Sequence, residues 1–336
     1  MSTPSSPTAR DAITHRSILA IAAPIMISNL STPLLGVVDT GVIGQTPDAS
    51  LIGAVALGAL IFNFVFWAFG FLRMGTTGLT AQAFGANNAR EIRASIGRAL
   101  LIAAVVGVCL ILLQWPIRQL AFWLLEGSER VEQLAQSYFD IRIWAAPATL
   151  ANYALLGWSI GLGKARIALL LQLVLNVSNM LLDAWFVLGL DMGVRGVATG
   201  TVIAEYLAAA VGLLVAVKHL HGIGGKWEAS RLFEPGQIAR TIAVNRDIMI
   251  RSLSLIFVFS WFIAQGAKFG ETVLAANAVL MHFVAVSAYF LDGFAFAAEA
   301  LVGRAVGAAH RAGLTQASRM TTWWAGGVAL FATCLL

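Results

Sequence analysis

LIGAVALGALIFNFVFWAFGFLRMGTTGLTAQAF, residues 51–84, carries a single charge, Arg73, in its whole length. A helix needs only about 20 apolar residues to cross the ~30 Å hydrocarbon core of a bilayer, because each residue adds about 1.5 Å. A stretch as long as this one therefore predicts a membrane helix that tilts, kinks or projects beyond the bilayer.

The rest of the chain has the same character. Of its 336 residues, 59% are hydrophobic and only 12% are charged, which is roughly half the charged fraction of a soluble domain. The apolar stretches predict an all-α integral membrane protein. We place its spans at residues 17–39, 51–84, 97–115, 134–160, 167–190, 196–217, 248–266, 272–303 and 321–336.

The positive charges indicate an orientation. With the N-terminus inside, sixteen of the 22 Lys and Arg residues fall in cytoplasmic segments, four fall outside, and Arg73 and Arg142 lie within spans. Such a bias is the usual topology signal of membrane proteins, so the net charge of +5 does not predict nucleic-acid binding. We expect a polar cytoplasmic tail over residues 1–16 and, as the location, the inner membrane of a bacterium.

The polar stretch 218–246 divides the spans into two groups. Its Gly, Pro and scattered charges are typical of a surface linker, which separates a first lobe of six spans (17–217) from a second lobe of about three (247–336). Aligning the second span of each group places Gly85 on Gly307. Parallel repeats of this kind are a known transporter design. We therefore predict a two-lobe transporter bundle with a pseudo-twofold repeat and an incomplete second lobe.

One group of buried polar residues predicts a functional site. Charges inside the membrane are candidates because each costs about 2.5–3.5 kcal/mol at mid-bilayer on insertion scales. Chain direction places Asp39, Asp183 and Thr201 in the outer half of the first lobe, and Asn179 precedes Asp183 by one helical turn on the same face. Two adjacent carboxylates in a dry setting cannot both ionise cheaply, so this group is suited to take up and release a proton.

Simpler interpretations of these charges stay open. Asp39 is also explained as a solvated carboxylate at the outer interface, and Asp183 as a structural group. For Arg142 we expect a structural ion pair with Asp140, or a side chain that extends to the interface. Glu205 lies near mid-span without an obvious cationic neighbour in the sequence, so we expect it to be protonated or hydrogen-bonded.

Further candidates lie elsewhere in the spans. Asp292 and Glu299 are seven residues apart, share a helix face and form a second candidate site. Arg73, towards the inner end of its span, is expected to contact lipid headgroups. Pro24 and Pro33 lie inside the first span, where they either fix a static kink or serve as a hinge.

The sequence shows no motif of enzymatic chemistry. It contains no H-E-x-x-H, G-x-S-x-G or Cys/His metal pattern, and both cysteines lie in apolar runs. GLGKAR (161–166) lacks the spacing and the preceding strand of a phosphate loop and is expected to be a cytoplasmic turn. We therefore predict neither an enzyme nor a bound metal or cofactor.

Six segments, in order, carry a family resemblance: AAPIMISNLSTPLLGVVDTGVIG (22–44), TAQAFGANN (80–88), YFDIRIWAAPATLANYALLGWSIGLGKAR (138–166), NVSNMLLDAWFVLGLDMGVRGVATGTVIAEY (176–206), IRSLSLIFVFSWFIAQGAKFG (250–270) and YFLDGFAFAAEALVGRAVGA (289–308). Over residues 15–336 the chain resembles the multidrug and toxic compound extrusion (MATE) transporters, in particular the DinF-like branch. The resemblance implies two six-helix lobes around a central cavity. Because about nine helices of that pattern are present, we expect a truncated chain.

The resemblance also implies site residues and a function. The acidic coupling residues of the family fall on Asp39 and Asp183, and their polar partners on Asn179, Thr201 and Asn152. The implied activity is proton-coupled antiport, with sodium as the alternative ion. Such a protein exports amphipathic or cationic compounds by alternating access and is surrounded by membrane lipids.

Two other functions stay open. A lipid-linked oligosaccharide flippase has a similar two-lobe design, but it would favour a strongly cationic central cavity, to which Arg73 contributes little. A non-transporting membrane scaffold or receptor would not need paired carboxylates in one layer of one bundle.

Overall fold

The computed structural model describes residues 13–46, 48–125, 128–224 and 227–335. Within these ranges every regular element is a helix, and seven helices are long and apolar enough to cross a membrane. The predicted all-α integral membrane fold is confirmed. Most of the predicted tail, residues 1–12, lies outside the described ranges, and the first helix begins at His15.

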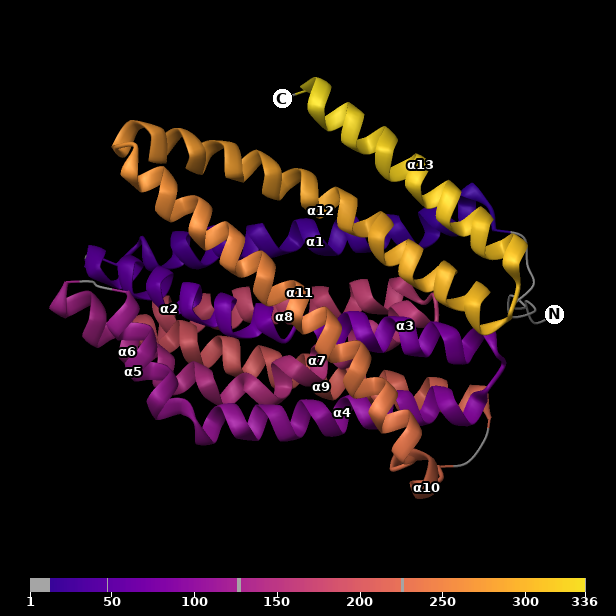
Figure 1. The fold of residues 1–336 in the computed structure, drawn as a ribbon. Coiled ribbons are helices and arrows are strands. Elements are labelled where there is room, and N and C mark those ends of the chain that lie inside the picture. Colours follow the sequence, from indigo (N-terminus) through magenta and orange to yellow (C-terminus); the bar gives the residue numbers. More distant parts are fainter. Residues whose placement is uncertain (1–12, 47, 126–127, 225–226, 336) are drawn as a thin grey trace.

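In chain order the elements are α1 (His15–Ile43), α2 (Ala49–Ala68), α3 (Phe71–Gly85), α4 (Ala89–Leu112), α5 (Gln114–Leu124), α6 (Glu129–Arg142), η1 (Ile143–Ala145), α7 (Ala146–Gly161), α8 (Ala165–Ala184), η2 (Trp185–Gly189), α9 (Gly193–Ile223), α10 (Ala229–Leu232), α11 (Pro235–Lys268), α12 (Glu271–Gly307) and α13 (Arg311–Leu335). The long helices run back and forth along an elongated bundle (Figure 1). We call the end at which α3 stops and α4 starts the Gly85 end.

Three predicted spans are interrupted rather than straight. The stretch 51–84 is divided into α2 and α3 by a turn at Phe69 and Gly70. The stretch 134–160 is divided into α6 and α7 by a 3₁₀ turn, and α8 ends in a π-helical turn. Turns of these kinds change the direction of a helix without ending the span. The excess length of residues 51–84 is therefore accommodated by a kink.

Two of the nine predicted spans are not among the seven apolar helices. The fourth is divided into helices of 14 and 16 residues, and each is shorter than the roughly 20 residues that a bilayer requires. The last, α13, opens with the polar and charged stretch RAGLTQASRMTT (311–322). The count of nine thus includes one span made of two short helices and one that is less apolar than the others.

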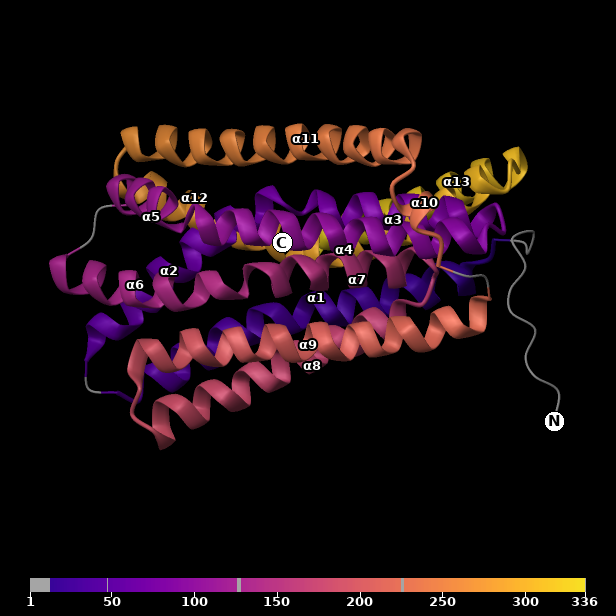
Figure 2. The same ribbon diagram turned by 90° about the horizontal axis from the view of Figure 1, so that it is seen from below.

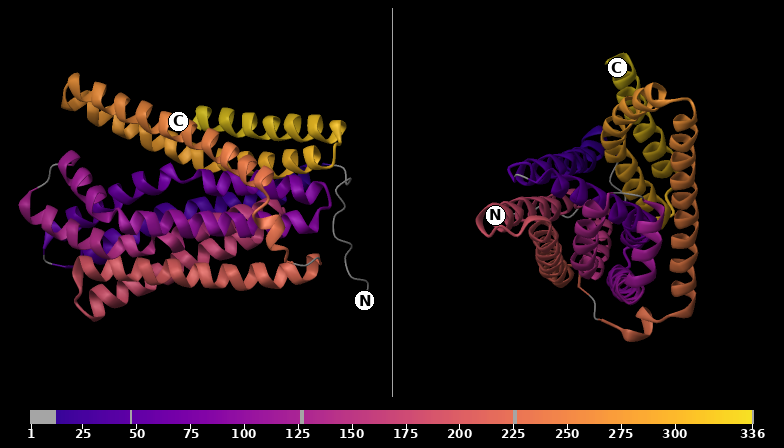
Figure 3. Two further views of the ribbon diagram at one scale, coloured as in Figure 1. Left: turned by 60° about the horizontal axis from the view of Figure 1, so that its bottom comes forward. Right: turned by 90° about the vertical axis from the view of Figure 1, so that its left-hand side faces the viewer.

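The core lies among α1, α3, α4, α7, α8 and α9, and α12 packs against both α1 and α3. Trp158 of α7 is buried there and donates its indole N–H to the Ile92 carbonyl of α4 over 3.2 Å. The second half of α12 is largely buried, whereas its first half is largely exposed. Figures 2 and 3 show α11 along the edge of the bundle, where most of its side chains are exposed.

α3 and α12 cross at the two glycines that the predicted repeat aligns. A Cβ atom on Gly85 would collide with the backbone of Arg304, and one on Gly307 would collide with the backbone of Gln82. The two contacts are equivalent because Gly307 follows Gly85 at the same spacing at which Arg304 follows Gln82. The crossing therefore has the self-complementary form of a twofold-symmetric contact.

The ends of α3 and α12 repeat the same local structure. Asn87 and Ala309, which the repeat aligns, both have a φ of 51°. The next N–H group closes back onto a helix carbonyl in each case, over 3.0 Å for Asn88 and 2.9 Å for His310. This is the usual way to end a helix with a left-handed residue. The agreement supports the repeat, and the division into two lobes at residues 218–246 stays a prediction.

We expect Gly85→Ala to lower the melting temperature of the protein by several degrees, because overpacking a tight contact costs about 1–3 kcal/mol. Gly307→Ala should lower the melting temperature by a similar amount. Gly78, on the same helix as Gly85, faces open space, so Gly78→Ala should leave stability unchanged or raise it by up to about 1 kcal/mol. Thermal unfolding in detergent measures all three, and equal melting temperatures for the α3 variants would contradict the close crossing.

Candidate functional site

Asp39 of α1 and Asp183 of α8 meet in the core of the bundle. Their carboxyl groups are close enough to interact electrostatically, and neither Asp39 Oδ1 nor Asp183 Oδ2 has a hydrogen-bond partner among the described residues. Asp183 is fully buried and Asp39 is half-buried. Ionised carboxylates have only acceptor atoms and repel each other, so two neighbouring carboxylates away from water do not both ionise cheaply. The pair is therefore a candidate for the uptake and release of a proton.

Two polar side chains extend this pair. Asn179 Nδ2 donates to Thr201 Oγ1 over 3.1 Å and lies 3.5 Å from Asp183 Oδ1. Thr201 in turn donates to the Val197 carbonyl of its own helix over 2.8 Å. The structure thus brings together four residues that the sequence grouped. We call them the aspartate cluster: Asp39, Asp183, Asn179 and Thr201.

Helix geometry and one glycine explain how the cluster forms. Asn179 and Asp183 are four residues apart in α8, so they lie on one face. α8 packs against α1 on one side and α9 on the other. Gly200 of α9 faces Asp183, and a Cβ atom there would collide with its carboxylate. The missing side chain lets the carboxylate lie directly against α9.

Asn152, predicted as a partner of the aspartates, instead binds Glu205. Its Nδ2 donates to Glu205 Oε2 over 2.8 Å and to the Glu205 carbonyl over 3.0 Å. Arg142 Nη2 approaches Glu205 Oε1 at 3.3 Å, and all three residues are buried. Glu205 is hydrogen-bonded, as one of the two expected alternatives has it, but it also has a cationic neighbour that the sequence did not indicate, because the packing of α6 against α9 brings Arg142 to it from 63 residues away in sequence.

The expected pair of Arg142 and Asp140 is also wrong. Asp140 faces outward and binds Arg118 over 2.9 Å, whereas Arg142 points into the bundle. Two residues apart on a helix, the side chains at 140 and 142 do not face each other. Tyr138, four residues before Arg142 on the same helix face, is buried and lies close enough for the charges of Arg142 and of both aspartates to act on it.

Tyr138 is a site residue that the sequence analysis missed. Its ring is 5% exposed, and it lies one helical turn from Arg142 on the same face. The four-residue spacing from Tyr138 to Arg142 is visible in the sequence and would have indicated that the two side chains share a helix face. We call the second group the arginine cluster: Arg142, Tyr138, Glu205 and Asn152. It adjoins the aspartate cluster, because the charge of Arg142 acts on Asp183.

The second candidate site lies between α3, α11 and α12. The charges of Arg73 and Arg251 act on both Asp292 and Glu299. The guanidinium carbon of Arg73 lies 4.4 Å from the ring centroid of Phe296, a favourable cation–π distance. Arg73 is therefore directed at α12, and the expected contact with lipid headgroups is not what the structure shows.

The prolines of α1 sit in a continuous helix. Between Pro24 and Pro33, Asn29 Nδ2 donates to the Tyr289 carbonyl of α12 over 3.2 Å. Ser31 Oγ accepts from Asn176 Nδ2 of α8 over 2.6 Å. The segment between the prolines therefore connects α1 to both α8 and α12, and the hinge stays a prediction.

The long apolar helices, the symmetric crossing and the buried polar clusters define an integral membrane protein with the architecture of a transporter. Solved structures share this fold. A point mutant of a MATE protein has a TM-score of 0.87 at 18% identity and covers 100% of this chain and 75% of that chain. A transporter of the MOP superfamily from Pyrococcus furiosus has a TM-score of 0.80 at 20% identity, covering 94% and 70%.

The chain belongs to the MatE family, whose profile matches residues 24–185 and 248–336. It is 43% identical over 317 residues to DNA damage-inducible protein F of Escherichia coli K12, covering 94% of this chain and 69% of that protein. It is 27% identical over 308 residues to multidrug and toxin extrusion protein 1 of Danio rerio, covering 87% of this chain and 49% of that protein. The predicted family and its DinF-like branch are confirmed.

Proposed function

We propose that the protein is a proton-coupled antiporter that exports amphipathic, often cationic compounds across the inner membrane of a bacterium, with its N-terminus in the cytoplasm. One observation supports the choice of ion: the Asp183 carboxylate is fully buried near the carboxylate of Asp39, and two neighbouring carboxylates away from water do not both ionise cheaply. The names of the Danio rerio relative and of a probable multidrug resistance protein of Thermotoga maritima, 25% identical over 206 residues, support the choice of substrate.

The proposed cycle begins with a proton that enters from the outer side. Protonation of the aspartate pair removes a negative charge between α1 and α8, and α1 then changes its bend at Pro24 and Pro33. Because α1 is bonded to α12 through Asn29 and to α8 through Ser31, such a change reaches both parts of the bundle. The compound leaves outward as the two lobes alternate.

Energetics allow this coupling. Exchange of one proton for one singly charged cation moves no net charge, so the pH gradient drives it; each pH unit supplies about 1.4 kcal/mol, enough to concentrate a singly coupled compound about tenfold. The aspartate cluster offers carboxylate, amide and hydroxyl oxygens, which are also ligands for hard cations. An experiment therefore has to distinguish a proton from a sodium ion as the coupling ion.

Proton movement in vesicles tests the proposal. The protein, as its gene encodes it, is reconstituted with an internal pH dye, and a cationic substrate such as ethidium is added on one side. We expect substrate addition to release protons from the lumen at low and high sodium alike. Substrate movement that follows a sodium gradient and leaves the internal pH unchanged would contradict proton coupling.

A further inference from the structure

A cavity of about 860 Å³ opens at the Gly85 end, between the last turns of α3, α9 and α12 and the first turns of α1, α4 and α13. Its cationic side chains are Lys164, Lys218 and Arg304, with His219 and His310 beside them. Among the described residues that line the cavity there is no Asp or Glu. The cavity is distinct from the aspartate cluster and shares no residue with it.

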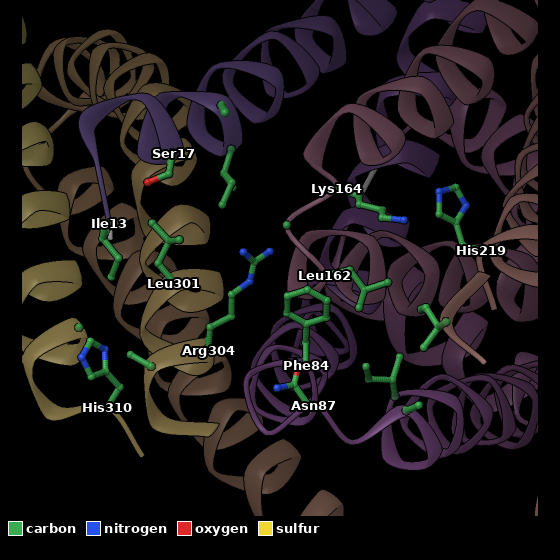
Figure 4. A pocket seen from close by; sticks show the side chains of 18 of the residues that line it. Ile13, Ser17, Phe84, Asn87, Leu162, Lys164, His219, Leu301, Arg304 and His310 are labelled. Carbon is green, nitrogen blue, oxygen red and sulfur yellow. The ribbon is translucent and has the colours of Figure 1, made fainter. Parts of the chain in front are cut away.

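Arg304 is fixed at one wall of this cavity. Its guanidinium carbon lies 4.7 Å from the ring centroid of Phe84. Gly163, at a φ of 69°, faces the guanidinium, and a Cβ atom there would collide with it. Arg304 Nε is buried and finds no acceptor in the described part of the chain. Figure 4 shows Arg304 extending from α12, with Lys164 on the opposite side of the cavity.

The charges of this cavity lack protein partners. Nearby Arg231 is paired with Glu234 at 3.1 Å. In contrast, Lys164, Lys218 and Arg304 form no ion pair with any side chain that the structure describes. Grouped cations of one sign raise the local concentration of anions, and the Arg304 guanidinium, whose Nε is buried, is unfavourable until it is paired. The cavity is therefore suited to an anionic ligand.

We infer that this cavity binds a phosphate-bearing amphiphile. A guanidinium matches phosphate oxygens through two parallel hydrogen bonds, and lysines add point charges. The remaining wall is apolar and includes Ile21, Phe84 and Leu301, which a free phosphate ion would leave uncovered but an acyl chain would cover. Basic pockets between helices at a membrane surface are typical sites for anionic headgroups. The inference does not depend on the ion that the aspartate cluster takes.

Native mass spectrometry of the protein, as its gene encodes it, tests the site with phosphatidylglycerol and phosphatidylcholine as probes. Lys164 and Lys218 are exposed, so Lys164→Gln/Lys218→Gln should fold normally. We expect this variant to bind phosphatidylglycerol about tenfold more weakly and Arg304→Gln to weaken it at least as much. Arg166→Gln is the matched control, because Arg166 is exposed in the same turn and does not line the cavity.

Competition by inorganic phosphate distinguishes a site for a lipid headgroup from a site for a free phosphate ion. Phosphatidylglycerol binding that persists in millimolar inorganic phosphate supports an amphiphile, because the acyl chains then add to recognition, whereas displacement by phosphate would overturn the amphiphile and leave a site for free phosphate. Equal binding of phosphatidylglycerol to the wild type and the double lysine variant would overturn the inference. So would an equal loss in Arg166→Gln, because the effect would then reflect surface charge alone.

Discussion

Asp183→Asn is expected to abolish export driven by a pH gradient while the protein stays folded. The amide has nearly the shape of the carboxylate and keeps an acceptor for Asn179, but it cannot take up a proton. One proton moving down a pH gradient of one unit supplies about 1.4 kcal/mol, which corresponds to a concentration ratio of about tenfold for a singly coupled monovalent cation. In vesicles with an imposed pH gradient, the accumulation ratio of a cationic dye should fall by about this factor.

Two comparisons make this test specific. Asp39→Asn removes the other carboxylate and should have a similar effect, because the proposed proton site consists of both groups. Asp140→Asn makes the same chemical change at a carboxylate that pairs with Arg118 near the surface, and it should leave efflux unchanged. If Asp183→Asn, present at wild-type abundance, accumulates dye as the wild type does, the proposed role of the pair is wrong.

The aspartate cluster could be predicted from the sequence because simple rules locate its members. Hydropathy gives the spans, and chain direction then gives the depth of Asp39, Asp183 and Thr201. The four-residue spacing from Asn179 to Asp183 gives a shared face. These rules give the depth of Asp39, but only the packing of α1 against α8 brings it to Asp183.

The arginine cluster could not be predicted in this way. Arg142 and Glu205 lie 63 residues apart, and only the packing of α6 against α9 brings them together. Arg73 and Phe296 meet for the same reason, through the packing of α3 against α12. Hydropathy records that a helix is apolar but not which neighbour each face meets, because lipid and helix surfaces are about equally apolar. Contacts between spans distant in sequence were therefore missed.

The sequence analysis allowed for a kink in residues 51–84 but did not locate the break between α2 and α3, for a related reason. The sequence around Phe69 and Gly70 is apolar on both sides, so the hydropathy pattern runs through the turn without a change. The symmetric crossing of α3 and α12 could be predicted in part from the sequence, since aligning the spans pairs Gly85 with Gly307. That these glycines touch the opposite helix is a property of packing that the alignment does not contain.

Arg142 connects the two polar clusters. Its Nη2 lies 3.3 Å from Glu205 Oε1, and its charge also acts on Tyr138. Its charge acts on Asp183, and its Nη1 is buried with no partner among the described residues. A change in the charge of the aspartate pair therefore alters the forces on Arg142, which links α6 and α9 to protonation between α1 and α8.

Arg142→Met is expected to lower the free energy of unfolding by about 3–5 kcal/mol, because it leaves Glu205 buried without its cation. Methionine still fills the apolar space beside Phe62 and Phe66, whose ring centroids lie 5.5 Å from the guanidinium carbon. The loss is therefore expected to come from the unpaired charge rather than from a cavity. Denaturation of the purified protein in mixed micelles measures it.

A double-mutant cycle separates the unpaired charge from the lost contacts. Arg142→Met/Glu205→Gln removes both charges and keeps an acceptor for Asn152, so we expect it to recover most of the stability that Arg142→Met loses. Arg118→Met, which breaks the more exposed pair with Asp140, should cost less than about 1 kcal/mol. If the effects of Arg142→Met and Glu205→Gln simply add, the two side chains are not energetically coupled, and the aspartate cluster then acts without a link to α9 through Arg142.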